Sequence, residues 1–258
     1  MRSSASGRVL ILGGTAEART LAAQLVAADR PVVSSLAGRV RDPALPAGEV
    51  RIGGFSTGAL DGVAGLAAYL IEHQITAVVD ATHPFAATIS ANAVAACTRT
   101  DTPLLRLERP GWRTHPDAGC WHWVDSVKEA VQVGTAYSQP FLTTGRQSLA
   151  VFAESWAAKD VTARVVDPPE FTLPARWQLI RSRGPYGYAN EHALMSKAGT
   201  DLLVTKDSGG SHTAAKLDVA RDLGIAVLVI ARPPTPAQVT RVASVAEART
   251  WLMGLTQS

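Results

Sequence analysis

The sequence predicts an α/β fold built from two parallel-sheet domains with a cleft between them. Short apolar runs alternate with longer amphipathic stretches along most of the chain, which is the pattern of βαβ units. At 258 residues the chain exceeds the length at which a single core usually splits. A segment rich in proline and glycine interrupts the alternation at residues 108–123. We place the boundary there, so that residues 1–108 form one domain and residues 109–258 the other.

In the first domain, apolar runs predict strands, and apolar residues three or four positions apart predict helices. The predicted strands cover residues 9–12, 31–35, a run that ends at Gly53, 77–80 and 104–107. The predicted helices cover about residues 16–28 and 60–71, and a third begins at Pro84, where a proline is well tolerated. Ser56 or Thr57 is expected to cap the second helix.

The same alternation continues in the second domain. The predicted strands cover residues 140–144, 161–166, 177–181, 202–206 and 226–231, and the predicted helices lie near 146–156, 188–197, 213–223 and 244–254. Both domains are therefore expected to be Rossmann-like, doubly wound sheets. Such sheets bind ligands at the carboxyl ends of their strands, where we look for the functional residues.

Composition and charge exclude several classes of function. The net charge is only +3, and no block of lysine and arginine runs through the chain, so we expect no nucleic-acid partner. No apolar run reaches the roughly 20 residues that a membrane span needs. Cys97 and Cys120 lack the spacing of metal ligands, so we expect no metal site and two reduced thiols in a cytoplasmic protein. The first seven residues do not form a secretory signal.

A glycine-rich turn, Gly13-Gly14-Thr15, connects the first predicted strand to the first predicted helix. Glycines at such a turn let backbone N–H groups approach a pyrophosphate at the helix N-terminus. The turn lacks the third glycine of the dinucleotide-binding pattern G-x-G-x-x-G, and an ordinary strand-to-helix loop is the alternative. Glu17 either caps the first helical turn or binds a ribose hydroxyl.

The end of the second predicted strand indicates the type of nucleotide. Folds that prefer NAD place an acid there to bind the ribose hydroxyls. This chain instead has hydroxyls, including that of Ser35, followed by Arg39. Because an arginine grips phosphate with paired charged hydrogen bonds, the sequence favours a 2′-phosphate and therefore NADPH. The alternative is that Arg39 is a solvated surface residue.

Further polar residues follow other strands. In the first domain, His83 lies in the segment Asp80-Ala81-Thr82-His83-Pro84-Phe85, where it either shuttles a proton or holds the loop. In the second domain, Thr143-Thr144-Gly145-Arg146 and Lys206-Asp207-Ser208-Gly209 combine hydroxyls, glycines and a cation, which suits anions. Arg181, Arg183 and Lys216 add cations nearby, with plain solvated charges as the alternative.

Taken together, these segments resemble the precorrin-6A reductase family of cobalamin biosynthesis over essentially the whole chain. The matching segments are 11–17, 37–39, 80–86, 106–110, 143–145, 206–209 and 231–233. Asp-Ala-Thr-His-Pro-Phe-Ala at 80–86 is the most distinctive of them. The resemblance implies hydride transfer from NADPH to a ring double bond of precorrin-6A, which gives precorrin-6B, with a proton added at the neighbouring carbon.

The resemblance also implies roles for individual residues. It leaves the source of the proton open between solvent and a residue of the cleft, and we take Lys206 and His83 as the first candidates. The expected cofactor-binding residues are Gly13, Gly14, Thr15, Ser35, Arg39, Gly53, Asp80, Thr82, His83, Pro84 and Phe85. The expected substrate-binding residues are Arg109, Thr144, Gly145, Arg146, Arg183, Ser208, Gly209 and Lys216. They would bind a small-molecule tetrapyrrole with several carboxylates by charged hydrogen bonds.

Two other functions remain open at this point. One is an NADPH-dependent reductase of another acidic ring or carbonyl substrate, and the other is a non-catalytic module that senses a dinucleotide. The anion-binding loops of the second domain argue against a sensor, which needs no site for an acidic substrate. The oligomeric state and the choice between a metal-free and a cobalt-bearing precorrin are also open.

Overall fold

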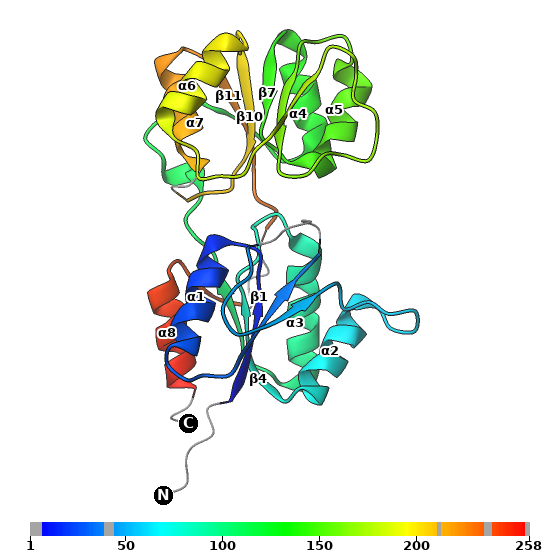
Figure 1. Cartoon of the computed structure of the whole chain (residues 1–258), viewed down its shortest axis with the longest axis vertical. Helices are drawn as coiled ribbons and strands as arrows, with labels where there is room; N and C mark the ends of the chain where they lie inside the picture. The colour runs from blue at the N-terminus through cyan, green and yellow to red at the C-terminus, as the bar shows by residue number, and fades with distance from the viewer. Residues whose placement is uncertain (1–6, 39–43, 211–212, 235–238, 256–258) are drawn as a thin grey trace, which may run out of the picture. The chain divides into compact units, whose positions relative to one another are not determined.

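The computed structural model describes residues 7–38, 44–210, 213–234 and 239–255, and the chain divides into two compact units (Figure 1). The first unit combines Met1–Arg109 with Pro234–Ser258, and the second consists of Pro110–Pro233. The sequence analysis assigned all of residues 109–258 to the second domain. The structure corrects this assignment, because the last 25 residues return to the first unit.

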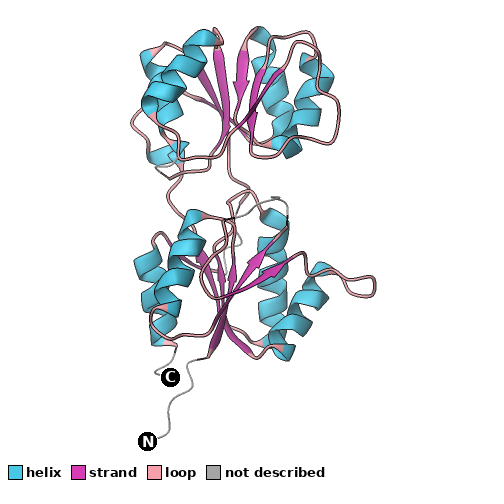
Figure 2. Ribbon diagram, in the orientation of Figure 1, coloured by secondary structure: helices cyan, strands magenta, loops and turns pink. Residues whose placement is uncertain are grey.

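The first unit is a parallel sheet covered by helices on both faces (Figure 2). Its strands are β1 (Arg8–Leu12), β2 (Val32–Leu36), β3 (Glu49–Ile52), β4 (Ile75–Asp80), β5 (Leu104–Leu107) and β12 (Thr240–Val242). Its helices are α1 (Ala16–Val26), α2 (Gly62–Glu72), α3 (Ala87–Thr100) and α8 (Val245–Gly254). The six strands lie in the order β12-β5-β4-β1-β2-β3, and every neighbouring pair is parallel.

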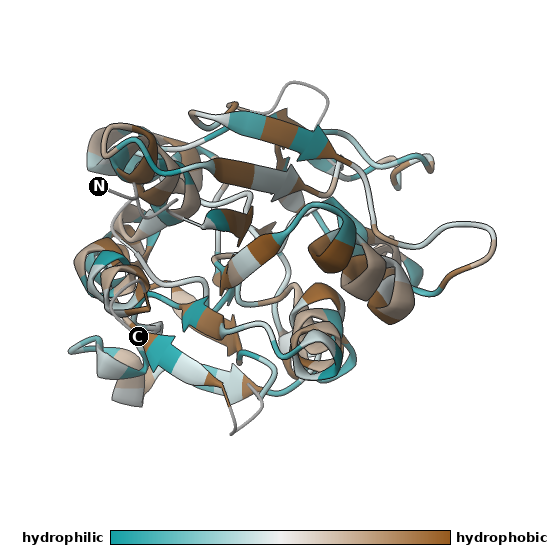
Figure 3. Ribbon diagram, turned by 90° about the horizontal axis from the view of Figure 1, so that it is seen from below, coloured by the Kyte–Doolittle hydropathy of each residue, from teal (hydrophilic) through white to brown (hydrophobic). Residues whose placement is uncertain are grey.

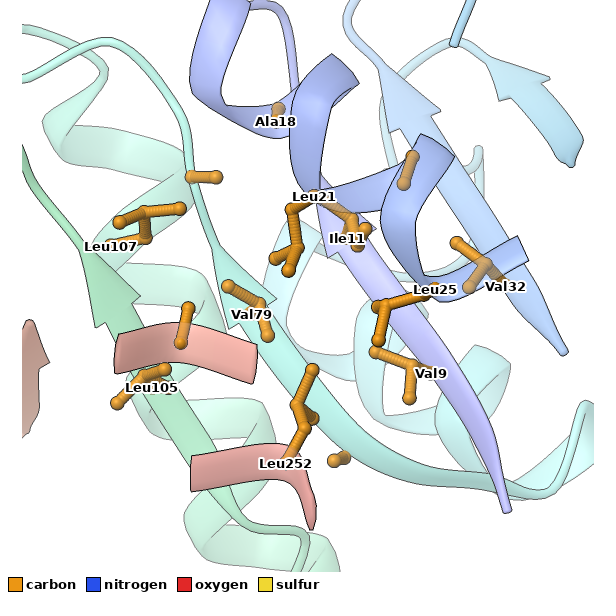
Figure 4. Close-up of a cluster of buried hydrophobic side chains, with 14 residues drawn as sticks. Val9, Ile11, Ala18, Leu21, Leu25, Val32, Val79, Leu105, Leu107 and Leu252 are labelled. Carbon is orange, nitrogen blue, oxygen red and sulfur yellow. The ribbon is translucent and has the colours of Figure 1, made fainter. Parts of the chain in front are cut away.

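Alternation along the central strand explains the two covered faces. Val9 and Ile11 of β1 pack into the cluster that includes Leu21 of α1 and Leu252 of α8 (Figure 4). Leu10 and Leu12 of β1 pack into a second cluster with residues of α2 and α3. Because both faces are buried, β1 is apolar from Val9 to Leu12, as strands of parallel sheets are.

The second unit has the same architecture. Its strands are β6 (His122–Val124), β7 (Pro140–Leu142), β8 (Thr162–Val165), β9 (Gln178–Arg181), β10 (Leu202–Lys206) and β11 (Ala226–Ile230). Its α-helices are α4 (Val127–Val133), α5 (Leu149–Trp156), α6 (Tyr188–Lys197) and α7 (Ala215–Asp222). Short 3₁₀ helices cover η1 (Trp112–Thr114), η2 (Ala118–Cys120), η3 (Gly134–Ala136) and η4 (Arg146–Ser148). The sheet order is β6-β11-β10-β7-β8-β9, again with parallel pairs.

The two sheets share a strand order and differ in the origin of one edge strand. From β1 in the first unit and from β7 in the second, the chain runs from near the middle outward to one edge and then returns to build the other side, as in doubly wound folds. The last position is taken by β12, the final strand of the chain, in the first unit. In the second unit the equivalent position is taken by β6, its first strand.

Most predicted elements are confirmed. The predicted strands at 202–206 and 104–107 and the helix at 188–197 have the observed bounds, and most other boundaries differ by one or two residues. Strands β6 and β12 and helix α4 were not predicted. Strands β6 and β12 are edge strands with the sequences HWV and TRV, so polar residues interrupt the apolar run that would have identified them. Figure 3 colours the residues by hydropathy.

Two predicted helix starts were wrong. Asp61 caps α2, rather than Ser56 or Thr57, and its carboxylate accepts hydrogen bonds from the N–H groups of Val63 and Ala64. Helix α3 starts at Ala87 rather than Pro84, because a turn closed by the Ala86 N–H and the His83 carbonyl precedes it. Among the described residues, no helix has the length and apolar character needed to cross a membrane.

Candidate functional site

The turn after β1 leaves the N-terminus of α1 open to a ligand. Thr15 caps the helix by accepting a hydrogen bond from the Ala18 N–H, and its hydroxyl donates to the Ala81 carbonyl at 2.7 Å. Gly14 has φ +112°, a conformation that favours glycine, and a Cβ built there would meet nothing within 4 Å. A helix N-terminus with open space beside it is suited to an anion.

The adjacent strand ends supply polar groups beside this turn. The Gly13 N–H donates to the Ser35 carbonyl at 2.9 Å, which ties the turn to the end of β2. The Ser35 hydroxyl accepts a hydrogen bond from Nη1 of Arg51 at 2.8 Å. Gly53, just past β3, has φ +121° and open space where a Cβ would lie. Arg51 also donates to the Gly53 carbonyl, so hydrogen bonds connect the predicted Gly13, Ser35 and Gly53 through Ser35 and Arg51.

Arg51 is a residue that the sequence analysis did not select. It lies two positions before Gly53 and faces Ser35 across the β2–β3 pair. One signal in the sequence could have identified it: Arg51 is a cation near the end of β3, and the neighbouring β2 ends without an acid. Arg39, the predicted 2′-phosphate contact, lies outside the described residues.

Asp80 and Thr82 belong to a buried network rather than to an open surface. The Asp80 carboxylate accepts hydrogen bonds from the backbone N–H and the hydroxyl of Thr82, and it pairs with Arg106 of β5 at 2.7 Å. The side chains of Asp80 and Arg106 are each only 4% exposed. This ion pair fixes the start of the loop after β4, so both predicted cofactor residues support the loop.

The rest of that loop is less buried. Nδ1 of His83 accepts a hydrogen bond from the Phe85 N–H at 3.3 Å, and the two rings lie 5.8 Å apart. In neutral imidazole the proton then resides on Nε2. His83 and Phe85 are half-buried, and Pro84 is buried between them. The contact with Phe85 accounts for the loop-holding role considered for His83. The imidazole is also partly exposed, so a ligand could still reach it.

Arg109 and Glu17 form an ion pair at this same edge of the first sheet, with 2.9 Å between Nη1 and Oε2. Glu17 therefore pairs with an arginine that the sequence analysis assigned to the substrate. The pair borders a small cavity of about 10 Å³, the space of a single water molecule. Its other lining residues are Thr15, Ala81, Thr82, Pro84, Leu107 and Glu108.

In the second unit, the loop after β7 is closed by its own hydrogen bonds. The hydroxyl of Ser148 donates to that of Thr144 at 2.7 Å and lies within hydrogen-bond distance of the Gly145 carbonyl. Thr144 is 3% exposed, so its hydroxyl supports the loop. Gly145 has φ +82° with open space beside it, and Nη1 of Arg146 lies 3.5 Å from the Pro168 carbonyl.

The loop after β10 is anchored by Asp207. Its carboxylate accepts a hydrogen bond from the Trp112 N–H and pairs with Nε of Arg232 at 3.5 Å. Burial lowers the pKa of the preceding Lys206. Gly209 has φ +64°, and a Cβ there would overlap with the Pro110 carbonyl oxygen. The predicted Ser208 and Gly209 therefore lie on a loop of fixed conformation, and the predicted Lys206 ends the strand before it.

The structure separates the two remaining predicted cations. Arg183 is exposed after β9. Lys216 is 3% exposed, and its ammonium donates to the Thr213 carbonyl at 2.8 Å. Burial lowers the pKa of Lys216 to about 7, with a further contribution from Arg164 that Glu191 opposes. Arg164 and Glu191 form a buried ion pair that the sequence analysis did not identify.

Comparisons with known proteins agree on one family. A family model described as precorrin-6x reductase CbiJ/CobK matches residues 8–253. A relative from Mycobacterium tuberculosis named precorrin-6A reductase is 52% identical, with 96% of this chain and 98% of the relative covered. One of that name from Rhodococcus erythropolis is 48% identical, with 97% and 99% covered.

Two further similarities extend this result. A relative from Salmonella typhimurium named cobalt-precorrin-6A reductase is 29% identical, with 88% of each chain covered. A solved structure described as CobK precorrin-6A reductase aligns with a TM-score of 0.87 and 37% identity, covering 96% of this chain and 97% of that one. The similarity therefore includes both the sequence and the fold of this chain.

Proposed function

Because this chain belongs to the precorrin-6x reductase CbiJ/CobK family, it is an oxidoreductase of cobalamin biosynthesis, and we propose that NADPH is its reductant. Such a reductase needs a nicotinamide cofactor, which supplies the hydride when bound. The substrate is a tetrapyrrole of the precorrin-6A type, and we propose that one of its ring double bonds is reduced to the level of precorrin-6B. The confirmed α/β fold and the family together support this reading over a dinucleotide sensor.

The observation that carries the cofactor proposal is the open, capped N-terminus of α1. Gly14 leaves space beside the first turn, and Thr15 holds the helix start in place. Partial positive charge at a helix N-terminus favours a pyrophosphate. Gly13, Ser35 and Gly53 border the same turn and would contact the nucleotide, as would Arg39. We propose that His83, Pro84 and Phe85 line the nicotinamide end and that Asp80 and Thr82 support them.

We propose that the second unit binds the carboxylates of the substrate. Backbone N–H groups near Gly145 and Gly209, the Ser208 hydroxyl and the guanidinium groups of Arg146 and Arg183 have the chemistry for this task. Thr144 would act by holding its loop. Lys216 is buried, so it would support the site through its hydrogen bond to the Thr213 carbonyl rather than by contact with the substrate. Arg109 would reach substrate or stay with Glu17, and Arg109→Ala distinguishes these roles through a change in KM.

Lys206 is our proposed proton donor, with His83 as the second choice. Burial lowers the pKa of Lys206, which makes its ammonium a stronger acid than an exposed lysine. Lys206→Met should then lower kcat by about 10²–10⁴-fold, the usual range for general acid catalysis, with little effect on NADPH binding. A loss of kcat of this size in His83→Asn, with no loss in Lys206→Met, would reverse the assignment.

A metal-free precorrin is the proposed substrate. The relatives named for precorrin-6A are 52% and 48% identical to this chain, and the one named for the cobalt form is 29% identical. Anaerobic assays with precorrin-6A and cobalt-precorrin-6A, followed by NADPH absorbance, test this choice. Faster turnover of the cobalt form would contradict it.

The first experiment is a titration of the purified protein with NADPH and with NADH, beside Arg39→Ala. We expect NADPH to bind more tightly, and Arg39→Ala to lose about 10–100-fold of that preference, the scale of a charged hydrogen bond. If neither nucleotide binds, the turn after β1 is an ordinary loop, and the cofactor proposal fails.

A further inference from the structure

Arg51 is a half-buried cation at the carboxyl edge of the first sheet, with no carboxylate paired to it among the described residues. This sets it apart from Arg8, Arg106 and Arg109 of the same unit, which all pair with an acid. Burial lowers the pKa of Arg51, so removing it from water has a cost that no neighbouring acid offsets. A bound anion would offset this cost.

The guanidinium of Arg51 is held rigidly in one orientation. Nη1 donates to the Ser35 hydroxyl at 2.8 Å and to the Gly53 carbonyl at 3.1 Å, and Nη2 donates to the Gly54 carbonyl at 2.8 Å. The plane lies over the ring of Phe55, 3.9 Å from its centroid. Since these contacts fix the side chain before any ligand arrives, binding costs little conformational entropy.

The contact with Ser35 also prepares a second hydrogen-bond donor. The Ser35 oxygen accepts from Arg51, so its own hydroxyl hydrogen can point to another acceptor. Ser35 ends the second strand of a doubly wound sheet, where folds that prefer NAD carry an acid that would repel a phosphate. Here the Ser35 hydroxyl, hydrogen-bonded to the Arg51 guanidinium, takes the place of that acid.

We propose that Arg51, through its fixed guanidinium and the Ser35 hydroxyl, is a specificity-determining residue that recognises the 2′-phosphate of the nucleotide. This inference rests on the proposed use of a nicotinamide dinucleotide at the α1 N-terminus, and it adds a residue that acts together with Ser35. The N–H groups of Arg51 not used by Ser35, Gly53 and Gly54 would donate to phosphate oxygens. An NADH molecule offers ribose hydroxyls there and gains little from the cation.

The test compares ligands with and without the 2′-phosphate on the full-length protein. Dissociation constants for NADPH, NADH, 2′,5′-ADP and 5′-AMP are measured by calorimetry for the wild type, Arg51→Gln, Arg51→Lys and Arg8→Gln. Arg8 is the matched control, because it lies on the same sheet at the amino end of β1 and pairs with Glu49. Thermal unfolding of each variant verifies the fold.

We expect Arg51→Gln to weaken NADPH and 2′,5′-ADP by about 10–100-fold, while NADH and 5′-AMP change less than about twofold. Arg51→Lys should keep part of the preference, because it retains the charge and loses the planar fork. Arg8→Gln should change none of the four constants. The advantage of NADPH over NADH should also shrink as salt increases.

Three results would overturn the inference. Equal weakening of NADPH and NADH in Arg51→Gln means that Arg51 only holds the loop, and the proposed cofactor site stands. Unchanged affinity for 2′,5′-ADP means that the 2′-phosphate lies elsewhere, which also leaves the cofactor site standing. A wild-type protein that binds neither dinucleotide overturns the proposed cofactor, and the assignment of Arg51 fails with it.

Discussion

In the first unit the loop after β1 leads directly into a capped helix, whereas in the second unit the loop after β7 folds back on itself. Thr15 caps α1, and Gly14 leaves open space beside it. At the equivalent place in the second sheet, Ser148 bonds to Thr144 and Gly145, and a 3₁₀ helix precedes α5. Both loops combine glycine with hydroxyls, yet only the first leaves a side-chain-capped helix N-terminus for an extended phosphate ligand.

The next pair of strands differs in the same way. In the first unit, Asp80 of β4 pairs with Arg106 of β5 and holds its own loop through Thr82. In the second unit, Asp207 follows β10, pairs with Arg232 after β11, and holds the Trp112 N–H. An acid and an arginine thus join equivalent strands in both units. The acid of the second unit also anchors the segment through which the chain enters that unit.

The largest expected effect comes from the more buried of these two pairs. Asp80→Ala removes the carboxylate 2.7 Å from buried Arg106 and leaves it with the more distant Glu108 at 3.8 Å, so it should destabilise the protein by about 3–5 kcal/mol. Asp207→Ala should cost about 1–3 kcal/mol, because Arg232 is partly exposed and its Nε lies 3.5 Å from the carboxylate. Urea unfolding of both variants measures the difference, and a larger loss in Asp207→Ala would break the comparison.

The next largest difference should be the loss of stability when a glycine of each loop is replaced by alanine. Gly209→Ala should cost about 3 kcal/mol, because the new Cβ would overlap with the Pro110 carbonyl and the backbone has φ +64°. Gly14→Ala should cost only about 1 kcal/mol, since its backbone is strained but the space beside it is open. Gly119→Ala is the control in the second unit, where a Cβ meets nothing. Chemical denaturation decides whether the order Gly209, Gly14, Gly119 holds.

A pH-dependent effect on stability should appear in the second unit. Lys216 has a folded-state pKa of about 7 and an ordinary value of 10.5, so between these pH values the unfolded chain binds the extra proton. Stability of the wild type should therefore rise with pH across this window, by up to about 1.4 kcal/mol per unit, relative to Lys216→Met. Unfolding measured at pH 7, 8 and 9 tests this, and parallel curves for the two proteins would refute it.

The smallest effect distinguishes the two thiols without changing stability. Burial raises the pKa of Cys97 in the first unit to about 12, and a contribution from Asp80 adds to this, while Cys120 in the second unit is exposed. We expect a thiol reagent at pH 8 to modify Cys120 rapidly and Cys97 only after unfolding. Cys120→Ser should leave no fast-reacting thiol, and rapid labelling of Cys97 in that variant would contradict its burial.

Strands buried on both faces were predictable because their hydrophobicity is continuous. The run Val9-Leu10-Ile11-Leu12 identifies β1 without any tertiary information. The edge strands β6 and β12 each have three residues and one or more polar side chains facing solvent, so their pattern resembles a loop. The return of residues 234–258 to the first unit also left no local signal, because strand partners are chosen by packing across the fold.

Candidate site residues were selected from the sequence by their position after a strand. Gly13, Ser35 and Gly53 were selected in this way, and the structure places them close together. The sequence does not distinguish an exposed polar side chain from a buried one, so it could not show that Asp80, Thr82 and Thr144 form hydrogen bonds within their own loops. The sequence analysis did not select Arg51, because its contact with Ser35 depends on the pairing of β3 with β2.

The path of the last 25 residues has a consequence for the order in which the protein is made. Helix α8 packs against α1, and β12 completes the edge beside β5, although the whole second unit separates them along the chain (Figure 1). During translation, the second unit is therefore complete before the first. Until β12 and α8 leave the ribosome, the first sheet has an open edge at β5, and the apolar face that α1 and α8 share is only partly covered. Exposed edges and apolar surfaces of this kind lead nascent chains to aggregate or to recruit chaperones.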